Sequence, residues 1–230
     1  MADIKTLLAR IAYSDIYTLE NDRTAYFFEA GMAIDADGAA HAYHPQTGMG
    51  LDYLGNAGVH GNWWALVTDN GMPSGKPLLQ KASDPAPGFY ISKTSLEDKD
   101  RALQDPRRYV DAEVIPFFVL PGKFKFGAKL GDLGIAINTG NGKICGCIHA
   151  DNGPSGKIGE ASIALANKLG VPSNPKKGGV AHGIVYVVFP GSASGWPASP
   201  DTLEQRAQAK FTAWGGLARL KNCLPDIAWQ

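Results

Sequence analysis

The chain of 230 residues is long enough for one large domain or two small ones, and its hydrophobic content of 44% suffices for a sizeable core. Basic and acidic residues number 22 each, so the formal net charge is zero. This balance argues against a nucleic-acid binder, which normally carries a basic surplus. Since no apolar run approaches the roughly 20 residues that span a bilayer, we expect neither nucleic acid nor a membrane span.

The N-terminal segment does not have the pattern of a signal peptide, because it has an early acid and only a short apolar stretch. We therefore expect a mature form that begins with an added Met, a cytoplasmic protein, or export by a route that needs no such signal. The cysteines Cys145, Cys147 and Cys223 are too few for a disulfide framework and lack zinc-site spacing. They predict buried free thiols, and no cofactor or metal is expected.

In chain order, the first half of the sequence predicts a few short elements. Helical spacing of Ile4, Leu7, Leu8 and Ile11 predicts a short N-terminal helix. A buried strand is predicted over 25–35, before the turn "DADG", and a loop over 40–62, which is rich in Gly, His, Asn and Tyr. Short strands follow at the start of 63–75, over 78–81 and over 88–96, and then a polar segment with at most a helical turn over 97–111.

The second half contains the strongest strand signals, over 114–122, 130–150 and 182–190, and "NTGNG" between two apolar runs predicts a hairpin turn. Helical spacing returns over 159–170, which Gly170 can cap, and after Ser199, which suits an N-cap. Short strands, glycine-rich connections and few helices favour a closed β-barrel over an open sheet. We therefore predict one mainly β domain with a few short helices.

Two carboxylates, Asp151 and Glu160, lie on either side of the break in "HADNGPSGKIGEAS". Hydrolysis of a glycosidic bond needs such a pair, one acid to protonate the leaving oxygen and one to activate water or attack carbon. We expect Asp151 at a strand end and Glu160 at the start of the next helix. A structural alternative is equally simple, because Asp before Asn-Gly forms turns and Glu at a helix start interacts with the dipole. The spacing by itself leaves both interpretations open.

The sequence resembles the family 75 glycoside hydrolases, the endo-chitosanases, over roughly residues 24–191. The segments that carry the resemblance follow in the expected order: "GMAIDADGA" (31–39), "GFYISKTSL" (88–96), "DPRRYVDAEVIPFFVLPG" (105–122), "LGDLGIAI" (130–137), "HADNGPSGKIGEASIALANKLGV" (149–171) and "GIVYVVFPG" (183–191). "ADxGP…IGEAS" beside "DPRRYVDA" is the most specific part.

The resemblance implies a hydrolase that cleaves β-1,4 linkages of chitosan with inversion, with Asp151 and Glu160 as its catalytic pair. It divides the chain into an N-terminal helical extension (1–23), a chitosanase-like catalytic β domain (24–191) and a C-terminal helical extension packed on it (192–230). The barrel pattern also resembles the double-psi β-barrels of sugar hydrolases and lytic transglycosylases. In those an aspartate at the same strand end is the acid, which favours Asp151 as proton donor and Glu160 as base.

Chitosan is a polycation, so its cleft needs further carboxylates. Asp35, Asp37 and Asp132 are expected to bind substrate, and Tyr90, like Trp63 and Trp64, is a candidate platform for sugar stacking. For Asp35 and Asp37, an Asx-type turn in "DADG" explains the acids equally well. A functional role is favoured more strongly for Asp132, because an acid between apolar strand residues is costly unless it is paired or at an open edge.

His149 lies two residues before Asp151, so on a regular strand it would share that face and could tune the acid, although a structural histidine is the commoner case. We expect a monomer that acts on a polysaccharide, outside the cell. Two other functions remain open. One is a hydrolase or lytic transglycosylase of peptidoglycan glycan strands, delivered as a toxin, and the other is a non-catalytic carbohydrate-binding barrel.

Overall fold

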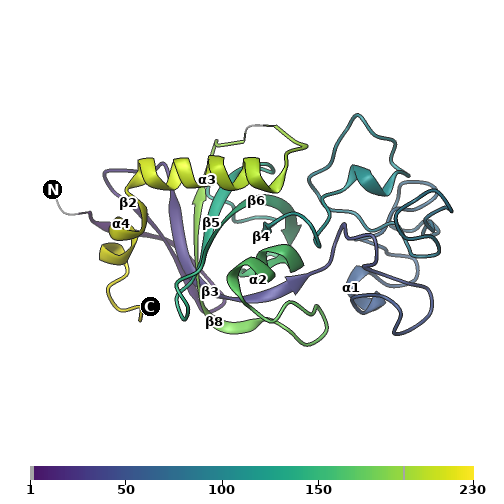
Figure 1. Ribbon diagram of the computed structural model, residues 1–230, viewed down its shortest axis with the longest axis horizontal. Coiled ribbons are helices and arrows are strands. Elements are labelled where there is room, and N and C mark those ends of the chain that lie inside the picture. The colour runs from purple at the N-terminus through teal and green to yellow at the C-terminus, as the bar shows by residue number, and fades with distance from the viewer. Residues whose placement is uncertain (1–2, 194) are drawn as a thin grey trace.

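Six strands close into a β-barrel in the computed structural model, which describes residues 3–193 and 195–230 (Figure 1). Their order is β3-β7-β4-β6-β5-β8, and pairing of β3 with β8 closes the circle. The bounds are β3 Tyr26–Asp35, β4 Phe117–Pro121, β5 Leu133–Asn138, β6 Ile144–Gly153, β7 Glu160–Ser162 and β8 Val180–Phe189. Closure leaves no open edge within the barrel, and it confirms the predicted mainly β fold with a closed barrel and few short helices.

The barrel mixes parallel and antiparallel neighbours. β3 pairs with β7 and β4 with β6 in parallel, whereas β5 pairs with both β6 and β8 antiparallel, and β3 pairs with β8 antiparallel. The β5–β6 hairpin with its turn at "NTGNG" is the one that the sequence predicted. Strands β4 and β5 are almost entirely buried on both faces, because side chains fill the barrel interior and helices cover the outside. Phe28 and Tyr186, for example, stack with centroids 5.1 Å apart.

The predicted N-terminal helix is wrong. Residues 5–11 form strand β1 (Lys5–Ile11), which makes a hairpin with β2 (Ser14–Leu19). Strand β2 in turn pairs antiparallel with the start of β3. The apolar residues at helical spacing do not mark a buried helix face, since Leu7 and Leu8 remain exposed. Tertiary pairing with β2 supplies hydrogen bonds that outweigh the weak local preference for a helix.

Helices α3 (Pro200–Trp214) and α4 (Gly216–Cys223) follow the last barrel strand, and α3 lies across the barrel next to β5 and β6 (Figure 1). Ser199 caps α3 as predicted, because its hydroxyl accepts the N–H of Thr202. The helix approaches the sheet closely at Gly146, whose N–H donates to Glu204. A Cβ on Gly146 would lie 2.9 Å from the Glu204 Cα, so only glycine fits there.

Helix α2 (Ile163–Leu169) begins after β7 and ends at Gly170, which has the predicted left-handed conformation. Its N-cap is Ser162, whose hydroxyl accepts the Leu165 N–H. The three cysteines are buried and free, as predicted. Within the described residues, no helix is both long and apolar enough to cross a membrane.

Residues 36–116 form a largely irregular segment at one end of the barrel, on the right in Figure 1. Its only helices among the described residues are the short α1 (Leu54–Ala57) and the 3-10 turn η1 (Pro106–Arg108). The short strands predicted within 63–96 are wrong, because these residues make only isolated bridges such as Leu66–Ser92. Strand-like residues here lack a neighbouring strand long enough to form a ladder.

Candidate active site

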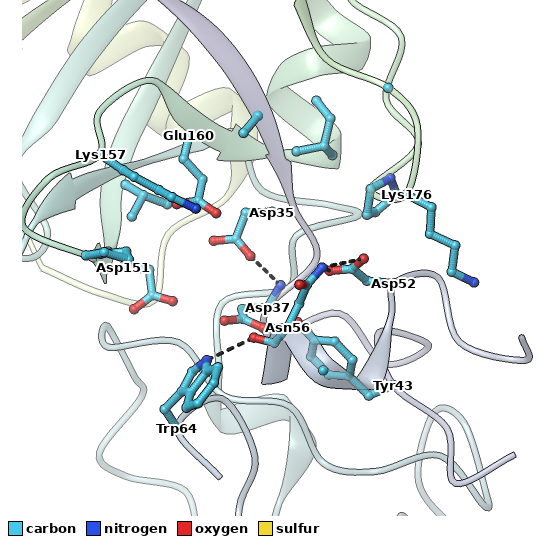
Figure 2. Close-up of a pocket in the computed structure, with 18 of the residues that line it drawn as sticks. Asp35, Asp37, Tyr43, Asp52, Asn56, Trp64, Asp151, Lys157, Glu160 and Lys176 are labelled. Atoms are coloured by element: carbon cyan, nitrogen blue, oxygen red, sulfur yellow. Dashed lines mark hydrogen bonds between the residues drawn. The ribbon is translucent and has the colours of Figure 1, made fainter. Parts of the chain in front are cut away.

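A cavity of about 640 Å³ lies where the end of the barrel meets the irregular segment (Figure 2). Five carboxylates and three lysines are on its wall: Asp35, Asp37, Asp52, Asp151, Glu160, Lys157, Lys176 and Lys177. The labelled acids point into the cavity from different parts of the chain. The predicted pair and two of the predicted substrate-binding acids therefore meet in one place.

Asp151 and Glu160 lie on the two strands that flank β4. Asp151 in β6 is the register partner of Val119 on one side, and Glu160 in β7 is its partner on the other. Register partners point to the same face of a sheet, so both side chains face the cavity, which Val119 also lines. Two interstrand spacings of about 4.8 Å put their Cα atoms roughly 10 Å apart.

Asp151 is held by three hydrogen bonds to a single oxygen. Its Oδ1 accepts the backbone N–H of Ser95 (3.0 Å), the Ser95 hydroxyl (2.5 Å) and the N–H of Asn152 (2.7 Å). Burial raises the pKa of Asp151, and the bonds from Ser95 and Asn152 oppose this rise because they stabilise the carboxylate. The donors leave Oδ2 as the oxygen without a hydrogen bond among the described residues.

Glu160 does not begin the helix, as the sequence suggested, but is the first residue of β7. Pairing of this short strand with both β3 and β4 delays the start of α2 to Ile163. Its carboxylate accepts no hydrogen bond from the described residues. Burial, followed by the negative charge of Asp151, raises the pKa of Glu160, while Lys157 opposes the rise. Of the pair, Asp151 is therefore the acid whose ionised form is stabilised by hydrogen-bond donors.

Asp35 and Asp37 extend the carboxylate cluster from the end of β3. The N–H of Asp37 donates to Asp35 Oδ1 (2.7 Å), so the Asx-type turn is present and the same acids line the cavity. Oxygens of Asp35, Asp37 and Asp151 lie within 4.8 Å of one another, close enough to contact a single cation. Burial raises the pKa of both Asp35 and Asp37 well above the ordinary value, and neighbouring carboxylates add to the rise.

Asp132 and Tyr90, two of the residues predicted to bind substrate, do not line the cavity. Asp132 is fully buried and accepts the N–H groups of Lys129, Gly191 and Ala193. Its charge is satisfied by backbone donors, which explains an acid between apolar strand residues. Tyr90 is half-buried against the core, where its N–H donates to the carbonyl of Tyr43.

His149 is also on the other face from the acids. It pairs with Phe118 and stacks on that ring, with centroids 5.6 Å apart, whereas Asp151 pairs with Val119. A register shift between Phe118 and Val119 inserts Ala150 as an extra residue. This bulge breaks the alternation on which the expected shared face depended.

Sequence reasoning missed the residues that hold the acids and extend the cavity. Tyr43 donates its hydroxyl to Asp37 (2.7 Å), and Ser95 holds Asp151. Both carboxylate oxygens of Asp52 accept hydrogen bonds from the side-chain nitrogen of Asn56. Ser95 and Asp151 are 56 positions apart in sequence, so no local pattern signals that contact.

Two smaller cavities share wall residues with the main one. One of about 260 Å³ shares Asp52 and Gly55 with it, and one of about 400 Å³ shares Asp37, Trp64 and Asp151. Both smaller cavities thus adjoin the main one at its acids. Trp64 is about half exposed on this wall, and its indole N–H donates to the Asn56 carbonyl (Figure 2), which fixes the ring for stacking.

The sequence matches one known family of proteins. The family described as the fungal chitosanases of glycosyl hydrolase group 75 matches residues 83–215, which is more than half of the sequence. The match includes Asp151 and Glu160, whereas Asp35 and Asp37 precede it. A search among curated proteins finds no match. The chain therefore belongs to the fungal chitosanase family of glycosyl hydrolase group 75, which makes it a glycoside hydrolase.

Proposed function

We propose that the protein is an inverting endo-glycosidase that hydrolyses the β-1,4 linkages of chitosan, with Asp151 and Glu160 as its catalytic pair. The observation that carries the proposal is the placement of these two acids on either side of Val119, facing one cavity. Inverting enzymes need a separation of about 6.5–9.5 Å between carboxyl groups, so that a water fits beside the sugar. The strand spacing of about 10 Å between the Cα atoms is compatible with this requirement.

The local environments assign different roles to the pair. Asp151 accepts three hydrogen bonds that favour its ionised form, which suits a general base that activates water. Glu160 lacks such donors and is buried near a negative charge, which suits a general acid that protonates the leaving oxygen. This assignment reverses the roles suggested by the barrel resemblance.

Asp35 and Asp37 suit the recognition of a cationic sugar. Their oxygens and those of Asp151 lie close enough to contact one cation, and the ammonium group of glucosamine is the cation that chitosan supplies. Binding of an ammonium relieves the repulsion between the buried carboxylates. A neutral acetylated unit offers no such compensation.

The adjoining cavities support cleavage within a polymer rather than at its end. One adjoins the main cavity at Asp52 and the other at Asp37 and Asp151, so they offer places for sugar units beyond the bond to be cleaved. Trp64 provides an exposed aromatic ring on the cavity wall. Action on a large polymer fits an extracellular enzyme, and a single chain already contains both acids, so a monomer suffices.

The test is a comparison of products from chitosan, chitin and peptidoglycan sacculi by mass spectrometry, with Asp151→Asn as the inactive control. We expect glucosamine oligosaccharides from chitosan, and a fall in viscosity before most reducing ends appear. Muropeptides with hydrated or anhydro ends, in place of chitosan products, would identify a peptidoglycan enzyme. Binding of a glycan without any product would identify a carbohydrate-binding barrel.

A further inference from the structure

The bulge at Ala150 determines which face of the barrel Asp151 occupies. β4 pairs with β6 through Phe118–His149 and then Val119–Asp151, so Ala150 has no partner on β4. In a regular strand, His149 and Asp151 would point to the same face. The extra residue places His149 against Phe118 and turns Asp151 towards the cavity.

One side-chain hydrogen bond spans this bulge. His149 Nε2 lies 3.0 Å from the backbone carbonyl oxygen of Asp151. A carbonyl oxygen only accepts hydrogen bonds, so Nε2 is the nitrogen that carries the hydrogen. The ring is fully buried, and its Nδ1 has no hydrogen-bond partner among the described residues. The backbone of Lys129 also lies near the ring, but the contact with Asp151 is the one that has hydrogen-bond geometry. It is therefore the polar interaction that distinguishes His149 from an apolar residue of similar size.

The bulge also organises the donors that hold the Asp151 carboxylate. The carbonyl of Ala150 accepts the N–H of Leu96 (2.8 Å), which fixes the segment that contains Ser95. The adjacent Ser95 then donates twice to Asp151 Oδ1. The orientation of the carboxylate and the position of its donors thus both depend on the bulge at Ala150.

We propose that His149 is a positioning residue for the catalytic base, holding the bulge at Ala150 so that Asp151 faces the cavity and meets Ser95. The inference rests on the proposed function, in which Asp151 activates water. Displacements of about 1 Å at such a group lower turnover by about 100-fold. Substrate binding elsewhere in the cavity does not depend on this bulge, so KM should change little.

The test compares His149→Met, which removes the donor, with His149→Gln, whose amide nitrogen can replace Nε2. We expect His149→Met to lower kcat about 10- to 100-fold with KM within about twofold, and His149→Gln to recover most of the loss. Thr18→Val is the control, since it removes another buried hydrogen bond, to the Ala25 carbonyl. It should lower the melting temperature without changing kcat.

A second measurement follows the Asp151 carboxyl directly, by its 13C chemical shift against pH. We expect a higher pKa in His149→Met, because the Ser95 donors no longer meet the carboxylate, and a value near wild type in His149→Gln. The charged groups that face Asp151 are unchanged in both variants; they are Asp35, Asp37, Glu160 and Lys93.

Three results would overturn the inference. They are an unchanged kcat in folded His149→Met, an equal loss in His149→Gln and His149→Met, and 15N shifts of the wild-type ring that place the hydrogen on Nδ1. The last needs no variant, so it decides the matter even if His149→Met does not fold. Failure of the wild-type enzyme to cleave chitosan would instead count against the proposed function, and the two failures are therefore distinguishable.

Discussion

Asp151 and Glu160 occupy matching positions on either side of β4, because both are register partners of Val119. Their separation is thus fixed by hydrogen-bonded strands rather than by flexible loops. The bulge in β6 and the short pairing of β7 are what bring the two acids onto one face. A pair held in this way keeps its spacing when substrate binds.

This spacing predicts the stereochemistry of the product. We expect the new reducing ends to form as the α-anomer, because water attacks the β-linkage from the opposite face in an inverting reaction. Proton NMR of the anomeric signals in the first minutes, before mutarotation, checks this. Initial formation of the β-anomer would mean that one carboxylate attacks the sugar directly.

Opposite limbs of the pH–rate profile should respond to two substitutions near the pair. Ser95→Ala removes a donor to Asp151, so the pKa of the base rises and the acidic limb moves up by about one unit. Lys157→Met removes a positive charge that lowers the pKa of Glu160, so the alkaline limb moves up. Profiles of kcat/KM report both shifts.

A neighbouring serine provides the control for this experiment. The Ser155 side chain makes no hydrogen bond among the described residues, so Ser155→Ala should leave both limbs in place. If Ser95→Ala moves the alkaline limb and Lys157→Met the acidic one, Asp151 is the acid and Glu160 the base.

Loss of at least about 100-fold in kcat is expected for both Asp151→Asn and Glu160→Gln, whichever of the two is the acid.

Gly153 leaves room for the Val119 side chain, next to the Glu160 carboxylate. A Cβ on Gly153 would lie 3.4 Å from Glu160 Oε2 and 3.1 Å from Val119 Cγ1. The contact with Val119 is the tight one, so Gly153→Ala should push the Val119 side chain, which lies between the two acids, and lower kcat about tenfold, with little change in the melting temperature. Gly156→Ala is a matched control, because nothing lies within 4 Å of its added Cβ. Equal activity of the two variants would show that the acid pair tolerates a shift of Val119.

Asp35 should lower the stability of the fold at neutral pH. Its pKa is raised above the ordinary 3.8 by burial and by the nearby carboxylates, so the folded protein binds the proton more tightly than the unfolded chain does. The free energy of unfolding therefore falls as pH rises from 3.8 through the raised pKa. Asp35→Asn removes the charge and keeps an oxygen for the Asp37 N–H.

We expect Asp35→Asn to raise the melting temperature at pH 7 by about 2–4 °C, as for a gain of about 1 kcal/mol. The gain should disappear below pH 3.8, where the wild-type carboxyl is protonated in both states. Calorimetry across this range is the measurement, with the exposed Asp226→Asn as a control. A variant less stable than wild type at pH 7 would mean that the charge at Asp35 is compensated.

Salt should weaken the binding of chitosan more than its cleavage. The cavity wall has more carboxylates than lysines, so it attracts a polycation, and salt screens this attraction with a Debye length of about 10 Å at 0.1 M. We expect KM to rise with salt while kcat changes little. Asp37→Asn should raise KM at low salt and flatten its salt dependence, whereas Glu20→Gln, an exposed acid outside the cavity, should not. A flat KM for the wild-type enzyme would contradict recognition by charge.

The sequence by itself determined the main strands, the β5–β6 hairpin and the capped ends of α2 and α3. Hydrophobic runs and turn residues encode these features locally. It also identified Asp151 and Glu160, because they belong to a motif that resembles one family. It also indicated Asp35 and Asp37, for which a local turn and a cleft acid were alternatives, and the structure shows both the turn and a place on the cavity wall.

Only the tertiary structure decided where the remaining groups lie. The N-terminal strand depends on pairing with β2, which overrides a weak helical pattern. The burial of Asp132 and the position of Tyr90 depend on partners far along the chain. The bulge at Ala150 reversed the face of Asp151 relative to His149, because one inserted residue changes the alternation of every side chain beyond it. Such contacts between distant segments leave no signal in the local sequence.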